Sequence, residues 1–210
     1  IVADHPLAPA RRHGSNWRFL LLTSHPMARV QQSIVDALER VAAALRETGA
    51  TVDTSSDLLP DLERQHAGYW KMLNIAMSRR APRPEGEAAP ELEPWLHLHD
   101  EQARNQRQWR RLFETYDAVI APTVGMTAFP HDPTPLATRR LSINGEDTQF
   151  FHQFVFPGLA TFPMLPATSV PIGNDADGLP IGVQVIADLY ADRTAIAAAR
   201  DIHDAAGGAQ

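Results

Sequence analysis

The sequence predicts an α/β fold that forms part of a mixed, mostly covered β-sheet flanked by helices. A strand, helix, strand succession over residues 17–54 should pair its two strands in parallel through a right-handed crossover. Two apolar segments, residues 167–172 and 181–186, are typical of neighbouring strands buried on both faces. The Gly- and Asp-containing residues 174–178 between them predict a turn. A further apolar strand, residues 117–122, follows a long helical segment, so helices and strands alternate as an α/β fold requires.

An amphipathic helix is predicted between the first two strands, over about residues 27–48. Its apolar positions recur at helical spacing and are Ile34, Leu38, Val41 and Leu45. Gly49 is the expected stop, because glycine readily adopts the left-handed conformation that ends many helices. This helix should cover one face of the sheet.

Two further helices are predicted, over residues 60–79 and 94–115. Residues 80–94 lie between them and are expected to form a flexible loop, because prolines and glutamates dominate this stretch. The first of the two helices should turn its apolar side chains inward. These side chains are Leu62, Tyr69, Met72, Leu73 and Ala76.

A hairpin turn and a last helix complete the predicted elements. Asn144 and Gly145 indicate a tight turn, because both central positions of such a turn need positive φ. Asp192 is expected to cap a helix that runs to about residue 206 and stops at Gly207 and Gly208.

Composition and length indicate one domain over residues 1–210. The chain has 210 residues, of which 44% are hydrophobic, so it can bury a substantial core. A net charge of -6 argues against nucleic acid as a partner. No apolar run approaches the roughly 20 residues that cross a bilayer, so no membrane partner is predicted. Absence of cysteine excludes disulfides and thiolate chemistry, no cofactor is indicated, and a cytoplasmic location is the default expectation.

No catalytic residue can be assigned from the sequence. Lys71 is the single lysine, and its mid-helix position favours a solvated surface group over a catalytic one. Ser55 and Ser56 lie in a predicted loop without the glycine that would let backbone amides converge on an oxyanion. Ser169 falls inside a predicted strand, and the G-x-S-x-G motif of α/β-hydrolases is absent.

No metal site is predicted either. His97 and His99 are two residues apart, and on a helix this spacing directs the two imidazoles to nearly opposite sides. No third histidine follows at ligand spacing.

Two loops after strands are the candidates for binding a ligand, because ligands of α/β proteins collect beyond the carboxyl ends of strands. The first is Thr123–Ala128, and the second is His152–Met164, which carries three phenylalanines among prolines. This aromatic segment fits an apolar pocket for a carboxamide, and it fits a core-filling segment equally well.

Five sequence motifs resemble the C-terminal half of the amidase signature family. They are YDAVIAPT at 116–123, SINGE at 142–146, LPATSVP at 165–171, GLPIGVQVI at 178–186 and DRTAIAAAR at 192–200. The resemblance implies hydrolysis of carboxamides by a serine nucleophile that is relayed through a second serine to a lysine. In the family this Ser/Ser/Lys segment lies upstream of all the motifs found here. The chain is therefore expected to be an incomplete C-terminal portion, inactive alone, with no catalytic residue of its own.

The same resemblance implies a set of substrate-binding residues on the acyl side of a small-molecule amide. They are Thr123, Val124, Gly125, Phe156, Thr161 and Phe162. Family members commonly have Asn-x-x-Gly before the Leu-Pro-Ala step, whereas Thr161 and Met164 occupy those two places here.

The sequence is also compatible with two other functions, and it predicts that the chain associates with itself. A non-catalytic α/β domain for binding or assembly is one alternative. The A-type subunit of a tRNA-dependent amidotransferase is the other, although the acidic net charge disfavours it. Because a partial sheet would expose an apolar face or edge, self-association as a dimer or larger species is expected.

Overall fold

The central element is a five-stranded mixed β-sheet. The computed structural model describes residues 7–10, 16–78 and 92–207. The strands are β1 (Arg18–Leu21), β2 (Thr51–Asp53), β3 (Ala118–Pro122), β6 (Ala167–Asn174) and β7 (Pro180–Ile186), in the order β2-β1-β3-β7-β6. β1 pairs in parallel with β2 and β3, whereas β7 is antiparallel to both β3 and β6. The predicted mixed sheet and its parallel first unit are confirmed.

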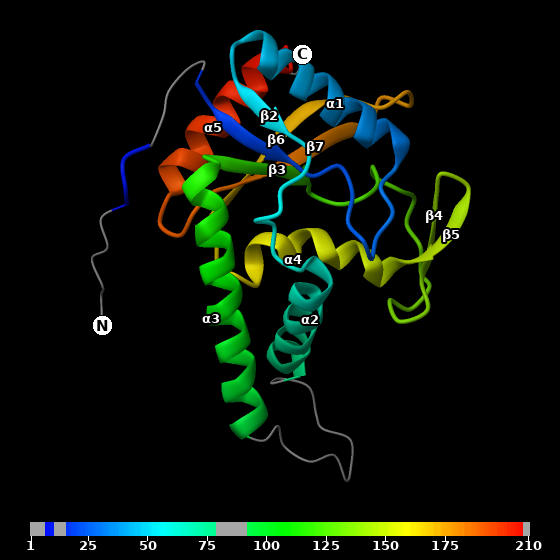
Figure 1. The fold of residues 1–210 in the computed structure, drawn as a ribbon. Coiled ribbons are helices and arrows are strands. Elements are labelled where there is room, and N and C mark those ends of the chain that lie inside the picture. Colours follow the sequence, from blue (N-terminus) through cyan, green and yellow to red (C-terminus); the bar gives the residue numbers. More distant parts are fainter. Residues whose placement is uncertain (1–6, 11–15, 79–91, 208–210) are drawn as a thin grey trace.

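Helices cover the sheet in two layers (Figure 1). α1 (Gln32–Glu47) and α5 (Asp192–Ala205) pack against each other and against one face. α2 (Leu62–Ser78), α3 (Leu92–Thr115) and α4 (Val155–Thr161) lie on the other side. Since β3 is buried at every position, both layers close over the middle of the sheet.

The sequence pattern accounts for most of the helices. α1 buries all four of its predicted apolar positions, and Gly49 follows it with a φ of 94°. In α2, Leu62 and Tyr69 are buried as predicted, but Ala76 is exposed. Position 76 shares the helix face of Tyr69 but lies near the carboxyl end of α2, where positions 74, 76 and 77 are all exposed.

The edge strand β6 differs from its prediction. The sequence predicts that both arms of the β6–β7 pair are covered on both faces, and this holds for the second half of β7. In β6 only Val170 and Ile172 are buried, while Ala167, Ser169 and Pro171 are exposed. Alanine and proline count as apolar in a sequence pattern but carry too little side chain to require a covering layer.

Three predictions are corrected by the structure: the start of one helix, the conformation of one segment and the cap residue of another helix. Residues 92–94 belong to α3 rather than to the predicted 80–94 loop, whose residues 80–91 lie outside the described residues. Residues 152–161, expected as a loop, form the end of a 3₁₀ helix, η1 (Phe150–Phe154), followed by α4. Asp192 does not cap α5. It is the first helical residue, where its charge still favours the helix dipole, and the cap position is Ala191.

The predicted hairpin is present as β4 (Arg140–Ile143) and β5 (Glu146–Gln149). Its turn residues Asn144 and Gly145 have φ values of 53° and 80°, as a tight turn of this kind requires. The Asn144 side chain also reaches the start of α1. Its Oδ1 accepts a hydrogen bond from Gln32 N at 2.9 Å, and its Nδ2 donates to Val30 O at 3.0 Å.

Candidate functional site

The candidate site is built around the loop that follows β3, at the carboxyl ends of the parallel strands. Gly125 lies at its centre and is buried. Gly125 N donates a hydrogen bond to Gln153 Oε1 at 2.7 Å, and Gly125 O accepts one from Gln31 N at 2.7 Å. The loop is thus held between η1 and the start of α1.

A second set of bonds ties this loop to the turn between β6 and β7. Thr127 N donates to Gln31 Oε1 at 3.1 Å, and Thr127 Oγ1 donates to Asp175 Oδ2 at 2.9 Å. Hydrogen bonds from Leu179 N and then from Thr127 hold the pKa of Asp175 below its usual range. Its carboxylate therefore remains charged and continues to anchor the loop in mildly acidic solution.

Gln184, on β7, connects the sheet to α4. Its Nε2 donates to Pro122 O and to Phe156 O, both at 2.8 Å, and the residue is buried. Thr123 Oγ1 donates to Gly182 O of the same strand at 3.2 Å. These contacts fix the end of β3 and the start of α4 relative to each other, which gives the site a rigid base.

The six predicted binding residues fall into two groups. Thr123, Val124 and Gly125 lie together with Phe156, whose ring closely approaches Gly125. Phe156 is buried, and Val124 is 37% exposed, so Val124 is the member whose side chain is open to solvent.

Thr161 and Phe162 lie at the far end of α4. The helical rise of about 1.5 Å per residue places them roughly 8–9 Å along the axis from Phe156. Thr161 is exposed, and Phe162 is buried against Gly68, in a separate small cluster with Tyr69 and Leu98. A single surface formed by all six residues is therefore not what the structure shows.

Histidines form a group that the sequence analysis did not identify. His25, in the loop after β1, is 5% exposed, and its ring lies edge-on to Phe156 and to His66 of α2, at centroid distances of 6.2 and 6.4 Å. His25 Nδ1 accepts a hydrogen bond from Met27 N at 3.2 Å. Burial, and then the neighbouring His66, lower the pKa of His25 to about 4. Burial, and then His152, lower the pKa of His66.

Because their pKa values are lowered, the imidazoles of His25 and His66 are neutral near pH 7, so they can donate and accept hydrogen bonds but do not act as cations. Positions 25, 66 and 152 are too far apart in the chain for a spacing pattern to reveal the group. Within residues 7–10, 16–78 and 92–207, no cluster of three metal-ligating side chains occurs.

The burial of His25 predicts that the fold loses stability in acid. A free histidine has a pKa of about 6.5, whereas burial lowers the pKa of His25 in the folded chain to about 4. The unfolded chain therefore binds a proton more readily, and the free energy of unfolding should fall as the pH is lowered from about 6.5 to about 4. Over this range the free energy of unfolding should decrease by at most about 3 kcal/mol, and above pH 6.5 His25 should cause no change. Urea unfolding across this range measures the decrease.

His25→Asn is the informative variant, because the asparagine oxygen can still accept from Met27 N. It should flatten the pH dependence, whereas His99→Gln, a change at an exposed histidine, should leave it as it is. An unchanged slope in His25→Asn would contradict the assignment.

An aromatic cluster lies beside the histidines. Phe150, Phe151 and Phe154 of η1 contact one another, and Trp70 of α2 packs edge-on to Phe151 and Phe154 at 5.2 and 5.9 Å. Phe129, 41% exposed, continues this surface from the β3 loop. The cluster supplies an apolar wall next to the loop.

Two side chains that were weighed as catalytic groups, Lys71 and Ser169, are exposed. Lys71 is exposed on α2 and lines an open cavity of about 530 Å³ between α2 and α3, to which no described serine contributes. Ser169 is exposed on the edge strand and pairs in register with Gln184.

Within the part of the chain that the structure describes, no helix has the length and apolar character needed to span a membrane.

Comparison with solved structures shows the same fold. A fatty acid amide hydrolase superposes with a TM-score of 0.72 at 16% identity, over 98% of this chain and 42% of that one. The A-type subunit of the glutamyl-tRNA(Gln) amidotransferase from Thermotoga maritima gives a TM-score of 0.70 at 20% identity, over 96% of this chain and 46% of that one. The chain thus spans less than half of either protein.

Comparison of sequences identifies relatives over about half of the chain. The fatty acid amide hydrolase of Medicago truncatula is 36% identical over 104 residues, which is 50% of this chain and 16% of that protein. The indoleacetamide hydrolase of Bradyrhizobium japonicum is 35% identical over 118 residues, which is 56% of this chain and 24% of that protein. The Amidase family model matches residues 73–196, more than half of the sequence. With the fold and the sequence in agreement, the chain belongs to the amidase family.

Proposed function

We propose that residues 1–210 form part of a single amidase domain that hydrolyses carboxamides, and that this portion supplies pocket walls and scaffold but not the nucleophile. The observation that carries the proposal is the Gly125 loop. Its backbone is held by Gln31 and Gln153, and its Thr127 side chain is held by Asp175, beside an aromatic wall, which makes a preorganised surface. Lys71, the single lysine of the sequence, is exposed on α2.

The proposed substrate is a carboxamide with an apolar acyl group. Val124 and Phe156 would face that group, with Thr123 and Gly125 holding the wall in place. Thr161 and Phe162 would contribute from the far end of α4. Two relatives are named for amides with an apolar acyl part, a fatty acid amide and indoleacetamide, which supports this choice. In the reaction, the C–N bond breaks as water adds its hydroxyl to the acyl carbon and its proton to the leaving nitrogen, giving ammonia or an amine and a carboxylic acid, which ionises to carboxylate.

The walls would act by positioning the acyl group and excluding bulk water from the reacting carbonyl. Both effects require a surface that keeps its shape, and the hydrogen bonds of Gln184 to Pro122 O and Phe156 O support such rigidity.

An assay on simple amides tests whether these residues lack the nucleophile. The purified chain should show no turnover of an aliphatic amide or of indoleacetamide above the buffer rate, by release of ammonia. Lys71→Ala and Ser169→Ala should behave as the parent chain does. Turnover that either substitution abolishes would overturn the proposal, because a nucleophile would then lie within these 210 residues.

We further propose that the chain self-associates through the open side of β6. Ala167, Ser169 and Pro171 are exposed there, on a strand whose outer edge has no partner strand among the described residues. Light scattering at micromolar concentration should give the mass of a dimer or larger species. A monomer mass together with no binding of an apolar dye would count against it.

A further inference from the structure

The tip of the β4–β5 ribbon carries the single Asn-Gly pair of the sequence, Asn144 and Gly145. Figure 1 shows this ribbon set apart from the main sheet. Both residues are exposed, and among the described residues Gly145 N donates no hydrogen bond. Asparagine followed by glycine is the dipeptide most prone to spontaneous deamidation, because glycine has no side chain to hinder the attack of its backbone nitrogen. The ribbon tip is therefore a candidate site of chemical modification.

The reaction needs water and no other reagent. Gly145 N attacks the side-chain carbon Cγ of Asn144, a new N–Cγ bond forms, and the Cγ–Nδ2 bond breaks. The leaving nitrogen takes the proton of Gly145 N and departs as ammonia, and a succinimide ring remains. Water then adds its hydroxyl to either ring carbonyl and its proton to the ring nitrogen. The product at position 144 is aspartate or isoaspartate.

The backbone of the folded turn opposes ring closure. Asn144 and Gly145 have φ values of 53° and 80°, and in a two-residue turn with positive φ at both positions the first has a ψ of about +30°. At this ψ, Cβ of Asn144 and the nitrogen of Gly145 lie on nearly opposite sides of the bond between Cα and the carbonyl carbon. The ring requires them on the same side, so the turn must open before Gly145 N can reach Cγ.

The side chain of Asn144 is also held away from Gly145. Its Oδ1 accepts a hydrogen bond from Gln32 N at 2.9 Å, and its Nδ2 donates to Val30 O at 3.0 Å. Beside the tip, Arg29 and Glu146 form an ion pair. These contacts join the ribbon to the start of α1, and the pair is protected for as long as they persist.

Either product would weaken this attachment. The NH₂ group that donates to Val30 O would be replaced by a carboxylate oxygen, so two acceptors, one of them charged, would face each other. Isoaspartate would in addition lengthen the backbone of a turn whose geometry fits only two residues. The modified tip could not make the contact with Val30 O that the asparagine makes.

We propose that Asn144 is a deamidation site whose reaction is controlled by the docking of the ribbon on α1. The amide is retained while the tip is docked and is lost when the tip leaves α1. Because the product cannot restore the contact with Val30 O, the modification makes the undocked tip permanent. The proposal does not depend on amidase activity.

Comparison of the folded chain with a synthetic peptide of residues 139–150 tests the role of docking. An isolated two-stranded ribbon is at best marginally stable, so the peptide presents the Asn-Gly pair undocked. In mildly alkaline buffer, mass spectrometry follows the mass gain from replacing NH₂ by OH at Asn144. Conversion in the folded chain should be at least about tenfold slower than in the peptide. Equal rates would contradict the proposal.

Gln32→Pro removes the N–H group that donates to Asn144 Oδ1. Position 32 is the first residue of α1, where proline is well tolerated, and Gln31 before it has the extended φ and ψ of -61° and 136° that proline permits. Conversion of Asn144 in this variant should be about threefold or more faster than in the parent chain. Gln32→Ala keeps the N–H group and should match the parent. A parental rate in Gln32→Pro would overturn the proposal.

Asn144→Asp reproduces one product and tests whether the change is permanent. The backbone amide NMR signals of residues 29–32 and of the ribbon should shift, because the contact with Val30 O is lost. Asn174→Asp makes the same chemical change at the exposed end of β6 and should leave these signals in place. Unshifted signals in Asn144→Asp would show that the modified tip still docks, and the proposal would fail.

Discussion

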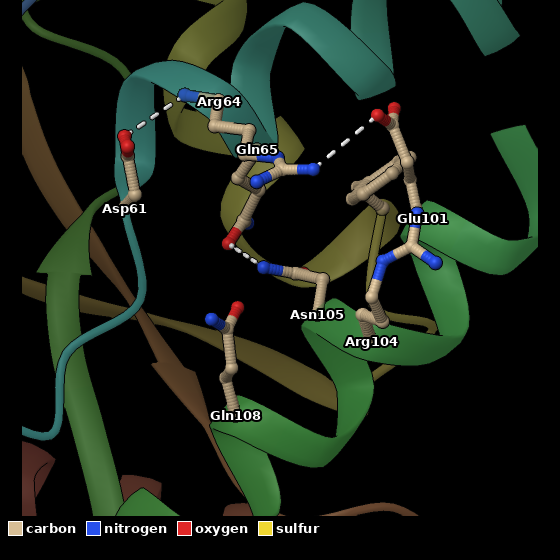
Figure 2. Close-up of a pocket in the computed structure, with 8 residues that line it drawn as sticks. Asp61, Arg64, Gln65, Glu101, Arg104, Asn105 and Gln108 are labelled. Carbon is tan, nitrogen blue, oxygen red and sulfur yellow. Dashed lines mark hydrogen bonds and ion pairs between the residues drawn. The ribbon is translucent and has the colours of Figure 1, made fainter.

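Gln65→Met is expected to lower the free energy of unfolding by about 3 kcal/mol, the largest effect of any single polar substitution proposed for this chain. Methionine preserves the approximate volume but removes four hydrogen bonds from a side chain that is 3% exposed. Each of the four partner groups would then lose one hydrogen bond, namely Gly158 O, Leu159 O, Asn105 Nδ2 and Trp109 Nε1, and Figure 2 shows the contact with Asn105. Chemical denaturation followed by tryptophan fluorescence measures the change.

Gln108→Met is the matched control for this variant. Gln108 lies on α3 but is exposed, so the same chemical change should alter stability by no more than about 0.5 kcal/mol. Equal effects at positions 65 and 108 would show that Gln65 does not join α2, α3 and α4 as described.

Gly125→Ala is expected to destabilise the fold by about 2–3 kcal/mol and to displace the loop after β3. A Cβ atom at this position would lie 2.3 Å from Arg29 O and 2.5 Å from Gln153 Oε1. A backbone carbonyl cannot rotate away as a side chain can, so the loop itself must move. Thermal unfolding, together with the backbone amide NMR signals of residues 123–128, reports both effects.

Gly182→Ala provides the comparison. The nearest atom to a Cβ there is Val170 O at 3.6 Å, which is an ordinary contact. This variant should be neutral or slightly stabilising, because alanine has less backbone freedom to lose on folding than glycine. Similar losses in the two glycine variants would mean that the close approach at Gly125 is not the cause.

The parts of the fold that could be predicted depend on short-range patterns. The spacing of Ile34, Leu38, Val41 and Leu45 predicted α1, and the Asn144–Gly145 pair predicted the β4–β5 turn, because each pattern acts within a few residues. The openness of β6 could not be predicted in this way. It depends on which elements cover the sheet, and that is set by segments far away in the chain.

The candidate site shows the same limit. Thr123 and Gly125 could be proposed from their place after a strand, but Gln65 and His25 could not. Gln65 binds groups 40 to 94 positions away, and the pKa of His25 is lowered by burial and by His66. The family resemblance implied that Phe156 and Phe162 both face the acyl side of the substrate. The intervening residues are helical, and this separates the two rings.

The Asn144 side chain has a consequence for how the chain assembles. An N–H group at the start of α1 is satisfied by a residue 112 positions later, from a two-stranded ribbon that pairs with no strand of the main sheet. The first turn of this helix therefore completes its bonding only after the ribbon has docked. Formation of the helix end is tied to a contact with a high loop-closure cost, so this corner of the molecule should acquire its native geometry late in folding.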